Sequence, residues 1–203
     1  MRAFPLPYDH AVDAPRAGHV ARAWDSGPPV ETARFGTWVF LGSEAFFFGG
    51  LLAAYVVLRS ASRAWEEPLA LGLGLALTAL LVASSLAASA AVRALRRGER
   101  ARGAQRVLWA GLLAGLFLGL QAWEWCQLLQ AGFTPQASLA GASFYVLTGA
   151  HGLHVLGGAL WLLGSACALR RAGSGSLHAE LAALYQHFVD LVWLVLFAIL
   201  YLS

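Results

Sequence analysis

Five long apolar stretches divide the chain, and short polar segments separate them. They cover residues 35–58, 69–92, 107–129, 141–169 and 181–202. About 20 apolar residues in a helix cross the hydrocarbon core of a bilayer, so each stretch is long enough to span it. The stretches are apolar on all sides, unlike the alternating strands of a membrane β-barrel, and lipid offers no partner for unpaired backbone groups. The pattern predicts an all-α, polytopic membrane helix bundle with five transmembrane helices.

The first 34 residues differ from the rest of the chain. They contain five prolines, charges of both signs and no apolar core of the kind found in a signal peptide. We therefore expect residues 1–34 to form an irregular arm outside the bilayer. Residues 35–203 are expected to form one five-helix transmembrane domain.

The composition agrees with a membrane protein. Hydrophobic residues make up 59% of the 203 residues, and charged residues only 12%, about half the charged fraction of a typical soluble domain. The formal net charge of +3 gives no reason to expect a nucleic-acid partner. The composition excludes an ordinary soluble domain.

The arginines indicate how the helices are oriented. All the basic residues are arginines, and twelve fall on one predicted side: in the N-terminal arm, in the 93–106 segment and at 170–171. Only Arg59 and Arg63 fall on the other side. Because cytoplasmic loops of membrane proteins are enriched in Lys and Arg, we expect the N-terminus in the cytoplasm and the C-terminus outside.

Small residues recur along the third stretch. Gly111, Gly115 and Gly119 are spaced four residues apart and therefore lie along one side of a helix. Such glycines let two helix backbones approach closely in a membrane, where apolar attraction does not separate helix from lipid. We expect this stripe to lie in a helix–helix contact.

Six ionisable residues lie inside the apolar stretches: Glu44, Glu124, His151, His154, His187 and Asp190. Each costs about 2.5–3.5 kcal/mol near the middle of a bilayer, so such groups usually face protein or water. Residues three apart share a face of a helix, which makes a hydrogen bond between His187 and Asp190 possible. By depth, Glu124 and His151 are also able to meet between helices.

Four interpretations of these groups compete. A di-iron or zinc site would use the histidines and carboxylates, but paired Glu-x-x-His motifs are absent and Glu44 and Glu124 differ in depth by roughly 14 Å. A haem would need two axial histidines, such as His154 and His187. A proton pathway would use Glu44, which lies next to three phenylalanines. The fourth interpretation is helix packing through hydrogen bonds, which we favour for the histidines and Asp190, whereas for Glu44 both roles stay open.

Four segments together resemble one known family. They are FGTWVFLGSEAFFFGGLLAAY (35–55), GLQAWEW (119–125), FYVLTGAHGLHVLGG (144–158) and HFVDLVWLVLFAILY (187–201). In this order, in four different predicted helices, they resemble subunit III of cytochrome c oxidase. One motif alone would be a weak signal, but four in order are specific.

The resemblance implies a subunit of a haem–copper respiratory oxidase in the inner membrane of a bacterium. Such a subunit holds no haem, copper or other metal and no catalytic residue. It docks on the catalytic subunit I, with subunit II in the same complex, and it binds phospholipid and supports proton uptake. By this resemblance Glu44 is the family's buried reactive carboxylate, and the polar residues of its motifs are Glu124, His151, His154, His187 and Asp190.

Two departures and three alternatives go with this resemblance. Longer family members have seven helices, and this chain starts at their third, so the lipid-holding cleft formed with the first two helices is absent or is completed by another subunit. Gln186 stands where the family commonly has Trp.

Related proteins provide alternatives to this interpretation. Quinol oxidases have a similar subunit, usually with Asp at the position of Glu44, and nitric oxide reductases have a similar accessory protein. The pair Ser43–Glu44 favours the cytochrome c branch. A stand-alone transporter is the alternative from another functional class.

Overall fold

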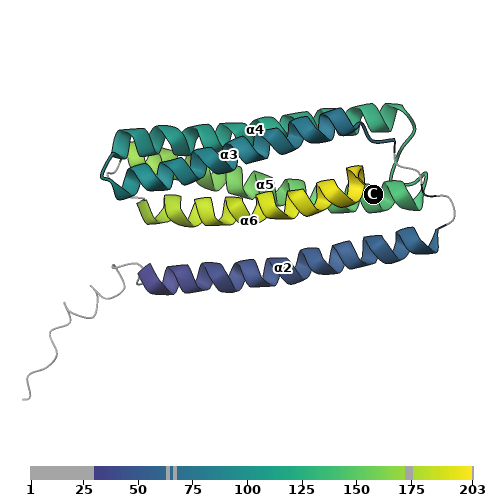
Figure 1. Cartoon of the computed structure of the whole chain (residues 1–203), viewed down its shortest axis with the longest axis horizontal. Helices are drawn as coiled ribbons and strands as arrows, with labels where there is room; N and C mark the ends of the chain where they lie inside the picture. The colour runs from purple at the N-terminus through teal and green to yellow at the C-terminus, as the bar shows by residue number, and fades with distance from the viewer. Residues whose placement is uncertain (1–29, 63–64, 66–67, 172–175, 203) are drawn as a thin grey trace, which may run out of the picture.

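All regular structure in the described residues is helical. The computed structural model describes residues 30–62, 65, 68–171 and 176–202. The helices, labelled as in Figure 1, are α2 (Val30–Ala61), α3 (Leu71–Arg96), α4 (Arg100–Gln130), α5 (Leu139–Arg171) and α6 (Ser176–Tyr201). Each is long and apolar enough to cross a membrane. The prediction of an all-α bundle with five transmembrane helices is confirmed.

The helices are longer than the apolar stretches that predicted them. They contain 26 to 33 residues, which corresponds to about 39–50 Å, whereas the hydrocarbon core is only about 30 Å thick. Their arginine-bearing ends therefore extend as helix into the polar region of the membrane. Hydropathy detects only the apolar middle of such a helix.

The start of α2 differs most from the expectation. This helix begins at Val30, so residues 30–34, expected to belong to the irregular arm, are helical. Pro28 and Pro29 precede it, and Glu31 in its first turn interacts favourably with the positive end of the helix dipole. The remainder of the predicted arm, residues 1–29, lies outside the described residues.

Four helices form a close-packed core, and α2 lies beside it (Figure 1). Helices α3, α4, α5 and α6 pack on one another, whereas α2 mainly contacts α5 and α6. Within the most apolar window of each helix, 56% of α6 is buried but only 17% of α2. Helix α6 is thus the centre of the bundle and α2 its least covered member.

The alternating helix directions place the arginines unevenly. The end of the bundle where α2 and α6 begin also holds the turn between α3 and α4 and the end of α5. We call it the arginine-rich end, because Arg34, the arginines of 93–106, and Arg170 and Arg171 lie there, whereas Arg59 lies at the opposite end. That this end faces the cytoplasm stays a prediction.

Small residues allow close contacts at a few positions. A Cβ on Gly111 would lie 2.9 Å from Leu163 of α5, so this glycine sits in a tight α4–α5 contact. Gly115 and Gly119 have nothing within 4 Å of such a Cβ. The predicted glycine stripe therefore contributes to packing within this chain only at Gly111.

A tight α3–α6 contact lies at Gly74. A Cβ there would lie 2.6 Å from the ring of Tyr201, whose hydroxyl is hydrogen-bonded to Glu124. We predict that Gly74→Ala destabilises the bundle by about 1–3 kcal/mol, because the ring must shift or the helices must separate. Unfolding in graded detergent mixtures, followed by circular dichroism, measures the change.

Gly72→Ala is the matched control, since a Cβ at Gly72 meets nothing within 4 Å. It gains the same helix propensity as Gly74→Ala, so it should be as stable as the unaltered protein or more stable. Equal stability of the two variants would contradict the packing at Gly74.

Candidate functional site

The polar residues inside the membrane-spanning helices form three clusters, and the first joins α2 to α5. Oε2 of Glu44 lies 2.8 Å from Nε2 of His154. Nδ1 of the same imidazole lies 2.7 Å from the backbone carbonyl oxygen of Ala150. The two side chains are only 18% and 19% exposed. The phenylalanines beside Glu44 in the sequence suggested an isolated carboxyl. In the structure Glu44 is instead one half of an interhelical pair.

Hydrogen bonds on both sides of the imidazole fix the Glu44–His154 pair. A backbone carbonyl only accepts hydrogen bonds, so Nδ1 of His154 donates to the carbonyl oxygen of Ala150. The second hydrogen bond joins Nε2 of His154 and Oε2 of Glu44. Such a pair lowers the cost of placing an ionisable group in hydrocarbon.

Aromatic rings surround His154 and its neighbour His151. Phe47 stacks on His154 with ring centroids 5.9 Å apart, and Phe48 meets it edge-on at 4.8 Å. Phe48 is 2% exposed, whereas Phe46 is 86% exposed and points away from the bundle. Of the three phenylalanines beside Glu44, two therefore surround the imidazole and the third faces outward.

His151 lies deeper in the bundle than His154. It is 1% exposed, stacks on Trp193 at 5.2 Å and meets Phe117 edge-on at 5.8 Å. Neither ring nitrogen has a hydrogen-bond partner among the described residues. The predicted contact with Glu124 is thus not formed as a hydrogen bond, and His151 packs as part of an aromatic core.

The second cluster holds Glu124 between α4 and α6. The hydroxyl of Tyr201 donates to Oε1 of Glu124 at 2.8 Å, and Nε2 of Gln121 donates to Oε2 at 2.8 Å. Glu124 is 3% exposed. The carboxyl is therefore satisfied by its own helix and by the end of α6, with no imidazole involved.

The third cluster joins α3 to α6. Nδ1 of His187 lies 2.6 Å from the hydroxyl oxygen of Ser85, and Nε2 lies 3.1 Å from that of Ser89. Asp190 accepts a 2.8 Å hydrogen bond from Nε2 of Gln186. The hydrogen bond that the sequence suggested between His187 and Asp190 is not formed, because each of them has another partner.

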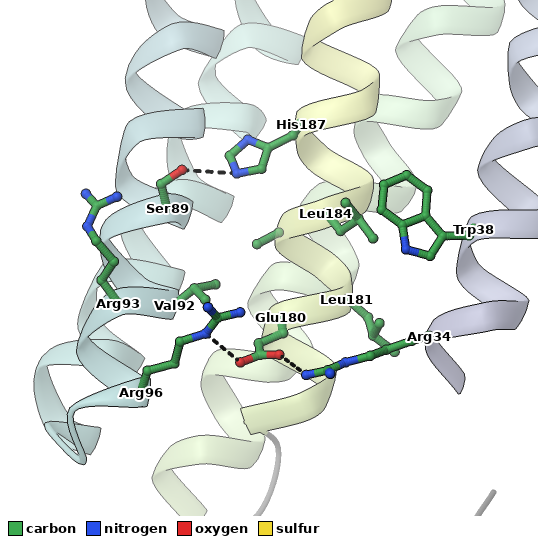
Figure 2. Close-up of a pocket in the computed structure, with 11 residues that line it drawn as sticks. Arg34, Trp38, Ser89, Val92, Arg93, Arg96, Glu180, Leu181, Leu184 and His187 are labelled. Carbon is green, nitrogen blue, oxygen red and sulfur yellow. Dashed lines mark hydrogen bonds and ion pairs between the residues drawn. The ribbon is translucent and has the colours of Figure 1, made fainter. Parts of the chain in front are cut away.

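A cavity of about 380 Å³ opens at the arginine-rich end, between α2, α3 and α6 (Figure 2). Arg34 and Arg96 converge there on Glu180, with N–O distances of 2.9 and 3.2 Å. Arg93 and His187 also line the cavity, and its apolar lining includes Trp38, Leu181 and Leu184. Two arginines share one carboxylate and a third lies beside them, so the mouth of the cavity carries excess positive charge.

Helix α2 is attached to the core by polar contacts at three heights. Arg34 pairs with Glu180 at the arginine-rich end, and Glu44 pairs with His154 near the middle. At the opposite end Arg59 donates to the backbone carbonyl of Ile199 at 3.2 Å. Since α2 buries little apolar surface, these contacts fix its position.

The clusters bear directly on the metal and haem interpretations. Among the described residues no group of three His, Cys, Asp or Glu side chains is close enough to hold a metal ion. His154 faces Glu44 on α2, whereas His187 faces two serines on α3. The two imidazoles thus point to different helices and do not form a pair of axial haem ligands.

Several partners of the ionisable residues were missed in the sequence. Gln121 lies three residues before Glu124, and Gln186 four residues before Asp190, so helical spacing alone identifies both amides as neighbours. Ser85, Ser89 and Tyr201 lie on other helices. No local signal pairs them with His187 or Glu124.

We predict that the Glu44–His154 contact contributes about 0.6–2 kcal/mol to stability, the range found for interhelical hydrogen bonds in membranes. Glu44→Leu and His154→Leu should each destabilise the chain, whereas Glu44→Gln keeps a hydrogen bond through its amide and should stay close to the unaltered protein. Unfolding of both single variants and of the double variant measures the coupling. Strictly additive effects of the two leucine substitutions would contradict a direct contact.

Comparison with known proteins shows which family the chain resembles. The family model for cytochrome c oxidase subunit III matches residues 26–203. Cytochrome c oxidase subunit 3 of Thermostichus vulcanus is 34% identical over 82% of this chain and 85% of its own length. The subunit 3 of Bacillus subtilis is 36% identical over 82% and 84%. Cytochrome bo(3) ubiquinol oxidase subunit 3 of Pseudomonas aeruginosa is 32% identical over 95% and 94%.

The family model covers the helices that carry all three polar clusters. The relatives align over most of their own length. The family match runs from α2 to α6. It includes the half-buried carboxyl of α2, the two histidines of α5 and the polar residues of α6. The chain belongs to the cytochrome c oxidase subunit III family.

Proposed function

We propose that this chain is the redox-inactive third subunit of a haem–copper terminal oxidase in a bacterial inner membrane. It docks on the catalytic subunit I, with subunit II in the same complex, and steadies that subunit during oxygen reduction. Haem and copper belong to the partner subunits. The observation that carries this proposal is that Glu44, Glu124, His154, His187 and Asp190 are engaged in hydrogen bonds within the chain. The bonds of Glu44, Glu124 and His187 join different helices, whereas the bond of Asp190 lies within α6.

The proposed contribution to proton uptake is indirect. Glu44 lies fourteen residues after Val30, about 21 Å along α2, and therefore near the middle of this 32-residue helix. At this depth the Glu44–His154 pair keeps α2 and α5 in register. We propose that this rigidity holds the neighbouring catalytic subunit in the form that takes up protons.

The cavity at the arginine-rich end supports phospholipid binding. Guanidinium groups form paired hydrogen bonds with phosphate oxygens, and Trp side chains are enriched at the depth of lipid headgroups. Arg93 and Arg96 would bind the phosphate, with Trp38 and Leu184 along the chains. In this chain α2, α3 and α6 would hold the lipid.

We assign the complex to the cytochrome c oxidase branch, because Ser43–Glu44 carries Glu where quinol oxidases usually have Asp. A quinol oxidase is the second candidate. The relative from Pseudomonas aeruginosa, a ubiquinol oxidase subunit, aligns with 95% of this chain.

Removing this chain should leave a haem-containing oxidase that starts at nearly the normal rate but loses activity sooner during turnover, because the catalytic subunit loses its lateral support. Oxygen consumption by membranes from cells with and without the chain, followed until activity decays, measures the lifetime. Restoring the chain from a plasmid is the control. An unchanged rate and lifetime without the chain would contradict the proposal.

Replacing Arg93 and Arg96 by Gln should lower the amount of anionic phospholipid that copurifies with the complex several-fold, because two phosphate-binding groups are lost. Arg97→Gln with Arg102→Gln is the matched control: the charge change is the same and at the same end, but neither residue lines the cavity. Native mass spectrometry of the complex counts the retained lipids. An equal loss of phospholipid in both double variants would show that lipid retention depends on the overall positive charge of this end and not on the cavity.

A further inference from the structure

A second cavity lies at the arginine-rich end, where α4 begins and α5 ends (Figure 1). It has a volume of about 660 Å³, which is within the range of cavities that hold small ligands. Its described lining residues belong to α4 and α5, and none of them lines the cavity between α2, α3 and α6. We call it the α4–α5 cavity.

Two arginines without an acidic partner line the α4–α5 cavity. Arg100 lines it from α4 and Arg170 from α5, and neither forms an ion pair with a described residue. Glu99, the neighbour of Arg100 in the sequence, pairs with Arg102 at 3.1 Å, and Glu180 is shared by two other arginines. No Asp or Glu of the described residues lines the cavity. The cavity therefore carries two uncompensated positive charges.

The apolar part of the lining begins beside the arginines and continues toward the middle of the membrane. Leu108 and Trp109 of α4 and Leu169 of α5 line the cavity. Leu169 is only 4% exposed, whereas Trp109 is 54% exposed. Trp109 is nine residues beyond Arg100 and therefore about 13.5 Å farther along α4. The cavity thus has a cationic end and an apolar end, as an amphiphilic ligand requires.

The cationic end lies at the depth of lipid headgroups. Helix α4 has 31 residues and is therefore about 46 Å long, about 16 Å longer than the hydrocarbon core is thick. Arg100 is the first residue of this helix, and Arg170 is the second-last residue of α5. Both guanidinium groups are therefore placed in the polar region of the membrane, and Trp109 is placed near its boundary with the hydrocarbon, where Trp is enriched.

We propose that the α4–α5 cavity binds an anionic phospholipid of the leaflet at the arginine-rich end. Arg100 and Arg170 hold the phosphate, because guanidinium groups form paired hydrogen bonds with phosphate oxygens. The side-chain amide of Gln105, which also lines the cavity, is a further donor for the headgroup. The acyl chains lie along Leu108 and Trp109. This is a second lipid site, and it does not depend on the proposed function, since only the charges and shape of this chain define it.

The charges also select the headgroup. Phosphatidylethanolamine carries an ammonium group, which the two guanidinium groups repel, and no described carboxylate lines the cavity to bind it. Phosphatidylglycerol carries a net negative charge and has hydroxyl groups in place of the ammonium. We expect the cavity to bind phosphatidylglycerol about tenfold more tightly than phosphatidylethanolamine, because basic residues near a membrane surface attract anionic lipids.

Arg100→Gln combined with Arg170→Gln tests the phosphate contacts. The tagged full-length chain, with any subunits that stay bound, is stripped of lipid in detergent and titrated with phosphatidylglycerol while native mass spectrometry counts the bound lipids. The affinity at this site should fall by about tenfold, whereas binding of phosphatidylethanolamine should barely change. Arg97→Gln with Arg171→Gln is the matched control, because both arginines are exposed at the same end and neither lines the cavity.

The same double substitution in a chain that also carries Arg93→Gln and Arg96→Gln tests whether there are two lipid sites. The two losses of phosphatidylglycerol should add, since the cavities lie on different helices. No further loss in the fourfold variant would show a single site and would overturn the second one.

Two measurements test whether the ligand is a lipid. Trp109→Leu should weaken binding of phosphatidylglycerol several-fold, because the indole ring contributes a large contact area, whereas Trp123→Leu should not. Trp123 is 52% exposed on the same helix and lies outside the cavity. A large excess of inorganic phosphate should leave the lipid bound, since phosphate makes no apolar contacts. Displacement by phosphate would show a site for free anions and contradict the lipid assignment.

Two further outcomes would refute the site. One is an equal affinity for phosphatidylglycerol in the variant with Arg100→Gln and Arg170→Gln and in its matched control. The other is loss of a copurifying protein in place of the lipid, which would show that an acidic partner protein pairs with these arginines. Absence of a haem-containing partner with the unaltered chain would refute only the proposed function.

Discussion

The structure depends on one constraint: a polar side chain inside hydrocarbon must find its partner within the protein. Apolar attraction cannot choose one helix arrangement over another, because lipid is as apolar as the helices. Close packing and hydrogen bonds between helices supply the choice instead. Glu44 with His154 places α2, Glu124 with Tyr201 places the end of α6, and His187 with two serines places α3.

The same constraint separates a rigid core from a peripheral helix. Helices α3 to α6 combine close packing, as at Gly74 and Gly111, with two buried polar clusters. Helix α2 has little burial and is attached by Arg34, Glu44 and Arg59 at three heights. Such an attachment leaves room for a lipid between α2 and the core at the arginine-rich end. In the proposed role, a subunit that supports a catalytic partner, shape is what the chain contributes, and a few polar contacts define that shape.

The fold was predictable from the sequence, because helix is the simplest structure for an apolar stretch in lipid and hydropathy locates each one. The cost of placing charge in a membrane singled out the ionisable residues inside the spans, but it gave no sign of the cavity where Arg34 and Arg96 meet Glu180. The hydrogen-bond partners of these ionisable residues on other helices were not predicted. Sequence gives the depth of Glu44 and His154 but not which helices are neighbours, so their pairing across 110 residues was missed. The contacts suggested for Glu124 with His151 and for His187 with Asp190 were wrong, because Tyr201 and the serines on α3 lie closer.

The central claim is that this bundle belongs beside a catalytic haem–copper subunit. It is tested most directly by isolating the tagged chain from membranes of cells that express an oxidase, in a mild detergent, and recording the visible absorption spectrum. The account predicts haem absorbance together with a large multi-helix partner identified by mass spectrometry. A colourless preparation that contains this chain without such a partner would contradict it.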